Sequence, residues 1–432
     1  MTDKTSTQVG QEMHRFITEL YPICRSITGD GVRETLRLIR KHIPLEIHEI
    51  PSGTKVFDWT VPQEWNIQDA YIKNNKGERV VDFKKSNLHV VQYSQPIHTK
   101  MTLEELKPHL HTLPESPEWI PYRTSYYKES WGFCLTHKQF QALQDEEYEV
   151  CIQSSLEKGS LTYGEYVIPG QTTEEVLISV NVCHPSLCND NLSGTVLAIH
   201  LAKKIRSEKP RYTYRFLFIP TTIGSIAWLS GHEKATENIR HGVVLTGVGD
   251  SGGFTYKKSR RGNAEIDRVF SHVFKHSQCE YTIIEFFPYG YDERQYCSPG
   301  FNLPVGCFMR TPHGQYPEYH TSGDNLTFVQ PQFLEESFSY CLQAMTILER
   351  NKIFMSQNPK CEPQLGKRGI YKVMGGQSDG AKKEMPMLWM LNLSDGHHSV
   401  LEIAERSGLP FDVLYEAAEI LVDHGLLKEI TR

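Results

Sequence analysis

The chain has 432 residues, of which 39% are hydrophobic, 11% aromatic and 23% charged. That length exceeds what one compact core holds, and the composition is that of a folded globular protein, so two or three domains are expected and a disordered or fibrous chain is excluded. A net charge of -6 opposes a surface built to neutralise phosphates, so no nucleic acid partner is expected.

The N-terminal stretch "MTDKTSTQVGQEMHRF" has no apolar segment of the kind found in secretion signals, and no apolar run approaches the roughly 20 residues that span a bilayer. We therefore expect a cytoplasmic protein with no membrane partner. The ten cysteines include no Cys-x-x-Cys pair, which predicts neither a disulfide framework nor a cysteine zinc site.

The predicted elements change in character twice along the chain. Apolar residues at helical spacing on both sides of "SITGDG" predict a helix, a tight loop and a second helix within residues 1–50. Residues 51–159 are rich in Trp, Tyr, Val and Thr and are broken by turn residues, which predicts an inserted all-β domain.

Residues 160–355 alternate between strand and helix patterns, which predicts an α/β core completed by residues 1–50. The expected strands are "EVLISVNV", "RYTYRFLFIP", "GVVLTGVG", "YTIIEFF" and "VGCFMR", and "FLEESFSYCLQAMTILERN" is a long helix that ends the core. Ligands bind at the carboxyl ends of the strands in open α/β sheets, so the polar residues that follow these strands are candidates for a site.

Residues 362–432 predict a winged helix-turn-helix with three helices. Its third helix carries Asp412, Glu416, Glu419 and Asp423 and almost no positive charge, whereas a DNA-reading domain is basic. A packing or partner-docking role is therefore preferred over DNA binding.

The stretch "VNVCHPSLCNDNLSG" places His184 at a strand end and Asp190 just before a helix. If the loop folds back, an imidazole nitrogen and a carboxylate meet, which is an ordinary pair of zinc ligands. Asn191 and Ser193 would cap the helix and orient Asp190. Alone, such a pair is also compatible with a structural role.

Two further residues strengthen the metal interpretation. Asp250 follows another strand in "VVLTGVGDSGG", and His320 stands in the polar loop "GQYPEYHTSGDN" before the long helix. Two histidines and two aspartates at one sheet edge favour a metal site.

These motifs resemble those of the co-catalytic zinc aminopeptidases: "HPSLCNDNLSG" their His…Asp-Asn-x-Ser-Gly motif, "GVGD" their later aspartate and "YHTSGDN" their terminal histidine loop. "LYPICRSITGDGVRETL", "GYDERQYCSPGFNLPVG" and the acidic tail resemble a branch with an inserted β-domain, often associated with bacterial polysaccharide or natural-product biosynthesis. The resemblance implies a mixed sheet flanked by helices, the inserted β-domain and the C-terminal winged helix. It also implies that Asp190 bridges two metals, with His184 and Asp250 on one and His320 on the other.

The family pattern fails after the strand "YRFLFIP". The peptidases carry two glutamates there, a general base and a metal ligand, but this chain has Thr221 and Thr222, whose hydroxyls serve neither purpose at neutral pH. We therefore expect one firmly held Zn²⁺, with the second absent or weak. A different carboxylate must act as base, and Glu293 is the first choice and Asp292 the second.

The same loop, "PYGYDERQYCSPG", supplies the candidate substrate-binding residues Tyr291 and Arg294, and Arg294 is suited to a bidentate contact with a substrate carboxylate. The alternative is a solvated turn with local salt bridges. Arg261 and His313 are further candidates for substrate binding, and each is also compatible with an ordinary loop residue.

The leading hypothesis is a zinc-dependent aminopeptidase-like hydrolase of an amide or peptide-like bond in a small peptide or aminoacyl substrate. The alternative is a weakened relative that binds a small aminoacyl or sugar-linked ligand, which the Thr221–Thr222 departure favours. A transcriptional regulator is a third and less favoured hypothesis. A homo-oligomer is compatible with the sequence, which does not specify its order.

Overall fold

The computed structural model describes residues 6–370 and 378–430. The outermost parts of the predicted core and winged helix (1–5 and 431–432) and residues 371–377 lie outside this range. The chain divides into two compact units: Met1–Ala264 with Glu280–Ser339, and Glu265–Cys279 with Tyr340–Arg432.

The first unit is built on an eight-stranded mixed sheet. Its four central strands run parallel to one another, and antiparallel pairing begins at β10 on one side and at β14 on the other. In order across the sheet the strands are β1 (Glu46–Pro51), β10 (Ser160–Ile168), β12 (Thr213–Ile219), β11 (Glu175–Asn181), β13 (Ile239–Leu245), β16 (Val305–Met309), β14 (Phe254–Lys257) and β15 (Tyr281–Ile284).

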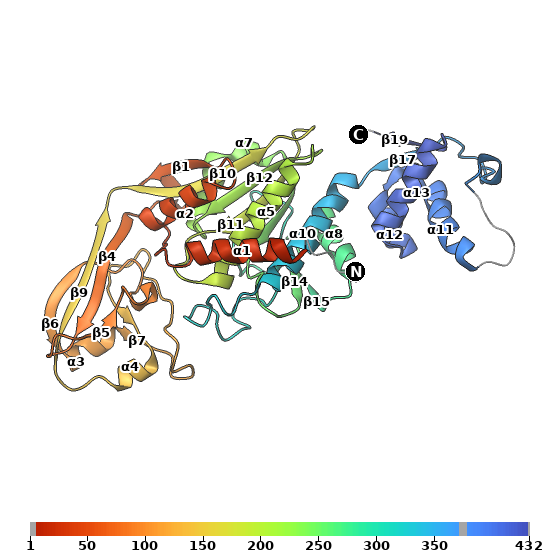
Figure 1. Ribbon diagram of the computed structural model, residues 1–432. Helices are drawn as coiled ribbons and strands as arrows, with labels where there is room; N and C mark the ends of the chain where they lie inside the picture. The colour runs from red at the N-terminus through yellow and green to blue at the C-terminus, as the bar shows by residue number, and fades with distance from the viewer. Residues whose placement is uncertain (1–5, 371–377, 431–432) are drawn as a thin grey trace. The chain divides into compact units, whose positions relative to one another are not determined.

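Helices cover this sheet, so its central strands are largely buried. All seven residues of β11 are buried, as expected for a parallel strand with both faces covered. Helix α5 packs on β11 and its neighbours, and α1 packs on α5 (Figure 1). The helices of this unit's core are α1 (Ser6–Leu20), α2 (Asp30–Arg40), α5 (Gly194–Arg206), α6 (Ile223–Gly231), α7 (Glu233–Thr236) and α9 (Glu293–Tyr296).

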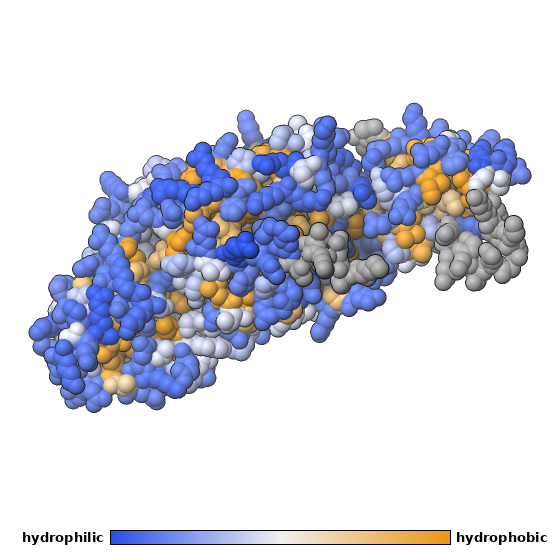
Figure 2. All heavy atoms as spheres, viewed as in Figure 1, coloured by the Kyte–Doolittle hydropathy of each residue, from blue (hydrophilic) through white to orange (hydrophobic). Residues whose placement is uncertain are grey.

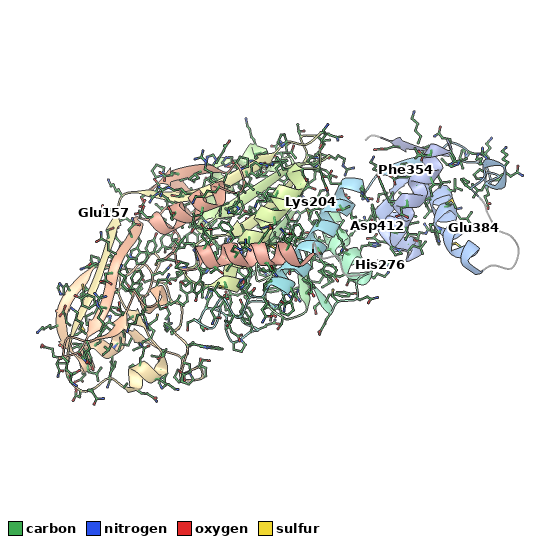
Figure 3. All side chains as sticks on the ribbon, in the orientation of Figure 1. Glu157, Lys204, His276, Phe354, Glu384 and Asp412 are labelled. Atoms are coloured by element: carbon green, nitrogen blue, oxygen red, sulfur yellow. The ribbon has the colours of Figure 1, made fainter. Side chains whose placement is uncertain are left out.

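Residues 52–159, which we call the inserted segment, lie between β1 and β10. Their main sheet is antiparallel, with the order β5 (Arg79–Asp82), β4 (Glu64–Lys73), β9 (Glu147–Glu157) and β6 (Ile97–Thr102). The long strands β4 and β9 run side by side, and Glu157 at the end of β9 is labelled in Figure 3. The remaining elements are β2 (Lys55–Val56), β3 (Trp59–Thr60), β7 (Leu110–His111), β8 (Phe133–Cys134), α3 (Leu103–Leu106) and α4 (His137–Gln141).

The second unit contains a three-stranded sheet, in the order β18 (Asp395–Ser399), β17 (Ile353–Ser356) and β19 (Leu427–Ile430). Its helices are α8 (Glu265–Lys275), α11 (Ser378–Leu393), α12 (Val400–Ser407) and α13 (Phe411–Asp423), while α10 (Pro331–Arg350) contributes residues to both units. Figure 3 labels Phe354 on β17 and Asp412 at the start of α13.

Local signals explain the boundaries in this unit. Ser399 and Glu402 form a reciprocal capping box at the start of α12, and Gly408 ends the helix in the left-handed conformation. The main-chain N–H of Phe411 donates to His272 Nε2 at 3.0 Å, which ties the start of α13 to α8.

The predicted fold class is confirmed: a mixed sheet flanked by helices, an additional β-rich part and a C-terminal winged helix. The strand β14 was not predicted. The division into units groups α8 with the winged helix, whereas the predicted domain limits placed it in the core, and those limits stay a prediction. Among residues 6–370 and 378–430, no helix has the length and apolar character to cross a membrane. Hydrophilic side chains dominate the face in Figure 2.

Candidate metal centre

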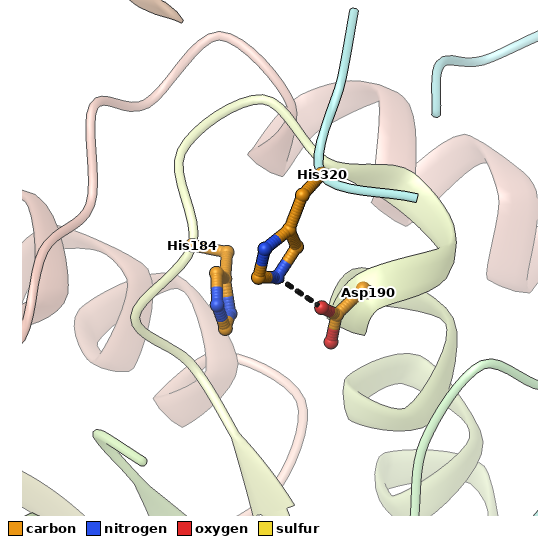
Figure 4. A group of neighbouring side chains, drawn as sticks. All are labelled: His184, Asp190 and His320. Carbon is orange, nitrogen blue, oxygen red and sulfur yellow. Dashed lines mark hydrogen bonds and ion pairs between the residues drawn. The ribbon is translucent and has the colours of Figure 1, made fainter. Parts of the chain in front are cut away.

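Three side chains from separate parts of the first unit converge at the carboxyl ends of the parallel strands. His184 lies after β11, Asp190 lies in the turn Cys188–Ser193 that precedes α5, and His320 lies in the loop between β16 and α10. Their potential ligand atoms all lie within 4.8 Å of one another (Figure 4). His320 Nε2 is 3.0 Å from Asp190 Oδ2, and the two imidazole centroids are 5.2 Å apart.

The protonation states suit metal binding. Burial lowers the pKa of His184 to about 4, so its imidazole is neutral at neutral pH and has a free lone pair. Burial acts to raise the pKa of Asp190, but the neighbouring His184 and His320 outweigh this effect and the net pKa is lowered, so the carboxylate is ionised. A neutral imidazole and an anionic carboxylate are ordinary zinc ligands.

Asn181 and Asp324 orient these ligands. The Asn181 side-chain nitrogen Nδ2 lies 2.9 Å from His184 Nδ1, and this contact fixes the orientation of the imidazole ring. The Asp324 carboxylate accepts the main-chain N–H groups of Cys188, Asn189 and Asp190 at 3.1, 2.6 and 2.9 Å. Burial raises the pKa of Asp324 to about 7, against the effect of these three donors.

Asp324 was not among the predicted site residues, although it stands in the same "HTSGDN" motif as His320. Asn191 and Ser193 were expected to cap α5 and to orient Asp190, and the structure differs in the second of these roles. The Asn191 side chain accepts the Gly194 N–H at the start of α5 and donates to Leu245 O, while Ser193 accepts the Val248 N–H. These two side chains therefore bind the loop after β13, and Asp324 orients Asp190.

Asp250 lies outside the group of three, so its predicted role as a fourth ligand stays a prediction. Its Oδ1 accepts the Thr311 hydroxyl at 2.6 Å, and its Oδ2 accepts the Asn189 amide at 2.9 Å. Asp250 acts here as an acceptor that joins Asn189 to Thr311.

The two predicted bases have different surroundings. Glu293, the first choice of general base, accepts from Lys257 Nζ through its Oε1 at 2.8 Å, and both side chains are 1% exposed. Its carboxylate is therefore already engaged in a buried ion pair. Asp292 accepts from the hydroxyls of Thr221 and Ser225. Burial raises the pKa of Asp292 to about 6, although these two hydroxyls act in the opposite direction.

Thr221 therefore has a partner that the sequence did not reveal. The threonine that stands at a family glutamate position donates its hydroxyl to a carboxylate from another loop. A carboxylate is present beside this position, and Asp292 supplies it.

Aromatic rings connect the predicted substrate loop to the metal ligands. Tyr291 lies 5.3 Å from His313 between ring centroids, His313 lies 6.2 Å from Tyr319, and Tyr319 stacks on His320 at 3.9 Å. Ring contacts therefore link Tyr291 and His313 to the cluster, and their role in substrate binding stays a prediction.

The two predicted arginines are placed differently. The Arg294 guanidinium lies over the ring of Tyr289, 5.9 Å from its centroid, and so borders the same group of aromatic side chains. Arg261 donates through Nε to Asn302 O at 2.8 Å on an exposed loop. The contacts of Arg261 do not connect it to the cluster.

Comparisons with known proteins agree with the fold and the motifs. A family model described as "Domain of unknown function (DUF4910)" matches residues 14–351, and one described as "winged helix-turn-helix" matches residues 352–429. A protein of Clostridium acetobutylicum described as "Putative polysaccharide biosynthesis protein with aminopeptidase-like domain" is 55% identical over 425 residues, 98% of each chain.

Solved structures extend the likeness. The crystal structure of a "putative peptidase" from Clostridium acetobutylicum is 53% identical, covers 99% of this chain and 98% of its own, and superposes with a TM-score of 0.95. The zinc aminopeptidase BSAP from Bacillus subtilis is 11% identical, with a TM-score of 0.57 over 78% of this chain and 94% of its own. A peptidase M28 precursor from Shewanella amazonensis is also 11% identical, with a TM-score of 0.54 over 80% and 96%. At this low identity, the likeness shows a shared fold.

Proposed function

Because the chain belongs to the DUF4910 family and has the fold of the zinc aminopeptidases, we propose that it is a zinc-dependent hydrolase of an amide or peptide-like bond with a single metal site. The observation that carries the proposal is the convergence of His184, Asp190 and His320 within 4.8 Å. Three protein ligands are the normal complement of a catalytic zinc site, which keeps a fourth position for water or substrate.

The residues present fit a cation. Asp190 is fully buried, and its Oδ1 has no hydrogen-bond partner among the side chains and main chain that the structure describes. A buried carboxylate oxygen without a donor is energetically unfavourable unless a cation or water satisfies it. The fully buried Asp324 holds the main chain of residues 188–190, which ends at this carboxylate.

Zinc in such a site polarises a substrate carbonyl and lowers the pKa of water to about 7. Asp292 is our choice of general base, because its raised pKa of about 6 lies near the working pH and it adjoins the position of the missing glutamate. The hydroxyls of Thr221 and Ser225 orient its carboxylate. Glu293 is less suitable, because Lys257 occupies one of its oxygens.

The chain's own residues also supply substrate contacts. Tyr291, His313 and Tyr319 form an aromatic wall beside His320, suited to the flat face of a peptide group or of a ring. Arg294 at the edge of this wall carries a charge suited to a substrate carboxylate. We infer a small peptide-like or aminoacyl substrate from this combination, and a cytoplasmic location remains our prediction.

A second candidate function is binding without turnover. Thr221 and Thr222 replace both family glutamates, and the group of three ligands does not include Asp250. A protein with this site could hold an aminoacyl or sugar-linked ligand through the same cluster and aromatic wall.

Metal analysis combined with turnover separates the two functions. Under the hydrolase proposal, purified protein holds about one zinc per chain and cleaves at least one member of an aminoacyl-anilide and aminoacyl-amide panel. Asp190→Ala abolishes both properties, while Arg261→Gln, on the exposed loop, leaves the zinc content unchanged. Zinc binding without turnover across the panel would favour the binding function, and absence of zinc at saturating supply would remove the metal site altogether.

A further inference from the structure

We propose that the inserted segment is part of the metal centre, with Gln92 as a positioning residue that fixes the two metal-binding imidazoles through Tyr122 and Arg25. The inference rests on the metal site of the proposed function. It goes beyond that function because it assigns a role to a part of the chain that supplies none of the three ligands.

The first link holds the main chain of the His320 loop. The Tyr122 N–H donates to His320 O at 2.8 Å, and the Ser322 N–H donates to Ile120 O at 2.9 Å. The Ser322 side chain accepts the Ile120 N–H at 2.9 Å. His320 has a φ of +56°, a left-handed conformation that is unfavourable for a residue with a side chain. Contacts from the inserted segment therefore hold the ligand in a conformation that it would otherwise leave.

The second link is the ring of Tyr122. It meets both imidazoles edge-on, with centroid distances of 5.2 Å to His184 and 5.1 Å to His320. This geometry is a favourable aromatic arrangement, and it limits the rotation of both ligand rings. The Tyr122 hydroxyl, in turn, donates to Gln92 Oε1 at 3.4 Å, and the Tyr126 hydroxyl donates to the same oxygen at 3.2 Å.

The third link runs from Gln92 to the other histidine. Gln92 Nε2 donates to Arg25 O, and Arg25 Nε donates to His184 O at 2.8 Å. Gln92 and Arg25 are both 0% exposed, so water does not replace these bonds. A single side chain of the inserted segment is thus connected to His320 through Tyr122 and to His184 through Arg25.

The chemistry of this position requires glutamine. The side chain must accept from two phenols and donate to a carbonyl at the same time, and only an amide offers both functions at this length. Met in its place keeps the length but removes the acceptor of both phenols and the donor to the buried Arg25 carbonyl, while the two hydroxyls keep their mutual contact at 3.2 Å. Ligand orientation by such outer residues typically accounts for 10- to 100-fold in metal affinity.

The experiment measures the zinc dissociation constant of the full chain by competition with a chromophoric chelator. Gln92→Met and Tyr122→Phe are compared with Tyr148→Phe, which removes a hydroxyl from another buried tyrosine of the inserted segment, where it is bonded to the main chain of Gln144. We expect about 10- to 100-fold weaker zinc binding for the first two variants and an unchanged constant for Tyr148→Phe. Visible spectra of the Co²⁺-substituted proteins should shift for the same two variants, because the ligand geometry changes.

Several outcomes would overturn the inference. Zinc affinity in Tyr122→Phe and Gln92→Met within twofold of wild type would do so, as would an equal loss in Tyr148→Phe. If Gln92→Met does not fold, Tyr122→Phe, which retains the ring, decides alone. If wild type binds zinc, Asp190→Ala does not, and Gln92→Met binds normally, then only the positioning role fails. A wild-type protein that binds no zinc would overturn the proposed function and this inference together.

Discussion

Asp292 carries the sharpest prediction at the scale of single residues. Asp292→Asn keeps the shape of the side chain and can still accept from Thr221 and Ser225, but it cannot take a proton from water. We expect kcat to fall by about 10²- to 10⁴-fold with zinc affinity unchanged, as for loss of a general base. Steady-state kinetics on a cleaved anilide and chelator competition measure the two quantities. An equal fall in zinc affinity would identify Asp292 as part of the metal site and not as the base.

The same carboxylate sets the expected pH dependence. A general base acts in its ionised form, and burial raises the pKa of Asp292 to about 6. The rate should therefore be constant above about pH 7 and fall tenfold per pH unit below about pH 6. In Asp292→Asn the residual rate should lose this step, and its persistence in the variant would assign the titration to another group.

The residues that would contact the metal were predictable from the sequence, whereas the residues that position them were not. His184, Asp190 and His320 follow strand or loop signals and carry metal-ligand chemistry, so the sequence was sufficient to select them. Asp324 works by accepting three N–H groups. Gln92 acts on the ligands through Tyr122 and Arg25, and no local sequence pattern indicates such a positioning role.

Among the elements, the start of α5 is closely constrained by the neighbouring strand. A Cβ on Gly194 would stand 2.4 Å from Leu245 O on the neighbouring chain segment, so helix and strand approach too closely for any other residue. Gly194→Ala should lower the free energy of unfolding by about 1–3 kcal/mol and weaken zinc binding, because the displaced turn carries Asp190. Urea titration and chelator competition test this.

Gly231 at the end of α6 is the matched control for Gly194. A Cβ there meets no atom within 4 Å, and alanine favours a helix by up to about 1 kcal/mol. Gly231→Ala should therefore leave zinc binding unchanged and stability equal or higher. If both alanine variants behave alike, the close approach at Gly194 is not what constrains the turn.

The loop that carries Asp292 depends on β14 through a buried ion pair. Lys257 on β14 and Glu293 are both 1% exposed, and Lys257 Nζ also donates to Tyr289 O at 2.8 Å. Lys257→Met leaves the Glu293 carboxylate uncompensated, so the free energy of unfolding should fall by about 3–5 kcal/mol. The double variant with Glu293→Leu should recover most of this loss, since an apolar pair of similar volume is tolerated. Urea unfolding of both variants decides, and equal stabilities would contradict the pairing.

The sequence pattern located the long central strands, whereas the short strand β14 was missed. The parallel strands β11, β12 and β13 have seven residues each, of which at least four are apolar, so pattern alone located them. Strand β14 has four residues, "FTYK", whose lysine is buried through its ion pair with Glu293, which hides the apolar pattern.

At the scale of the whole chain, the order of the folded parts along the sequence was predictable, but the contacts between distant segments were not. Shifts in composition distinguished the β-rich insertion from the α/β pattern. Helical periodicity without intervening strand patterns distinguished the acidic tail from the α/β core. The contact of Ile120 with Ser322 joins residues 202 positions apart. A single sequence contains no signal for such a pairing, so the inserted segment's approach to the metal ligands emerged only from the structure.

The winged helix gives a prediction for the molecule's partners. Asp412, Glu416, Glu419 and Asp423 are all exposed on α13, the helix that a DNA-reading domain of this type would need to be basic. We expect no binding to a 30-base-pair duplex at about 50 mM salt in fluorescence anisotropy, because these carboxylates repel phosphates.

The variant Asp412→Lys, Glu416→Lys, Glu419→Lys should gain weak binding that disappears as salt rises. The control variant Glu104→Lys, Glu115→Lys, Glu129→Lys makes the same charge change on the inserted segment and should gain less, since it lacks a helix shaped for the groove. Tight, salt-dependent binding by the wild type would reverse our assignment of this domain and restore the regulator hypothesis.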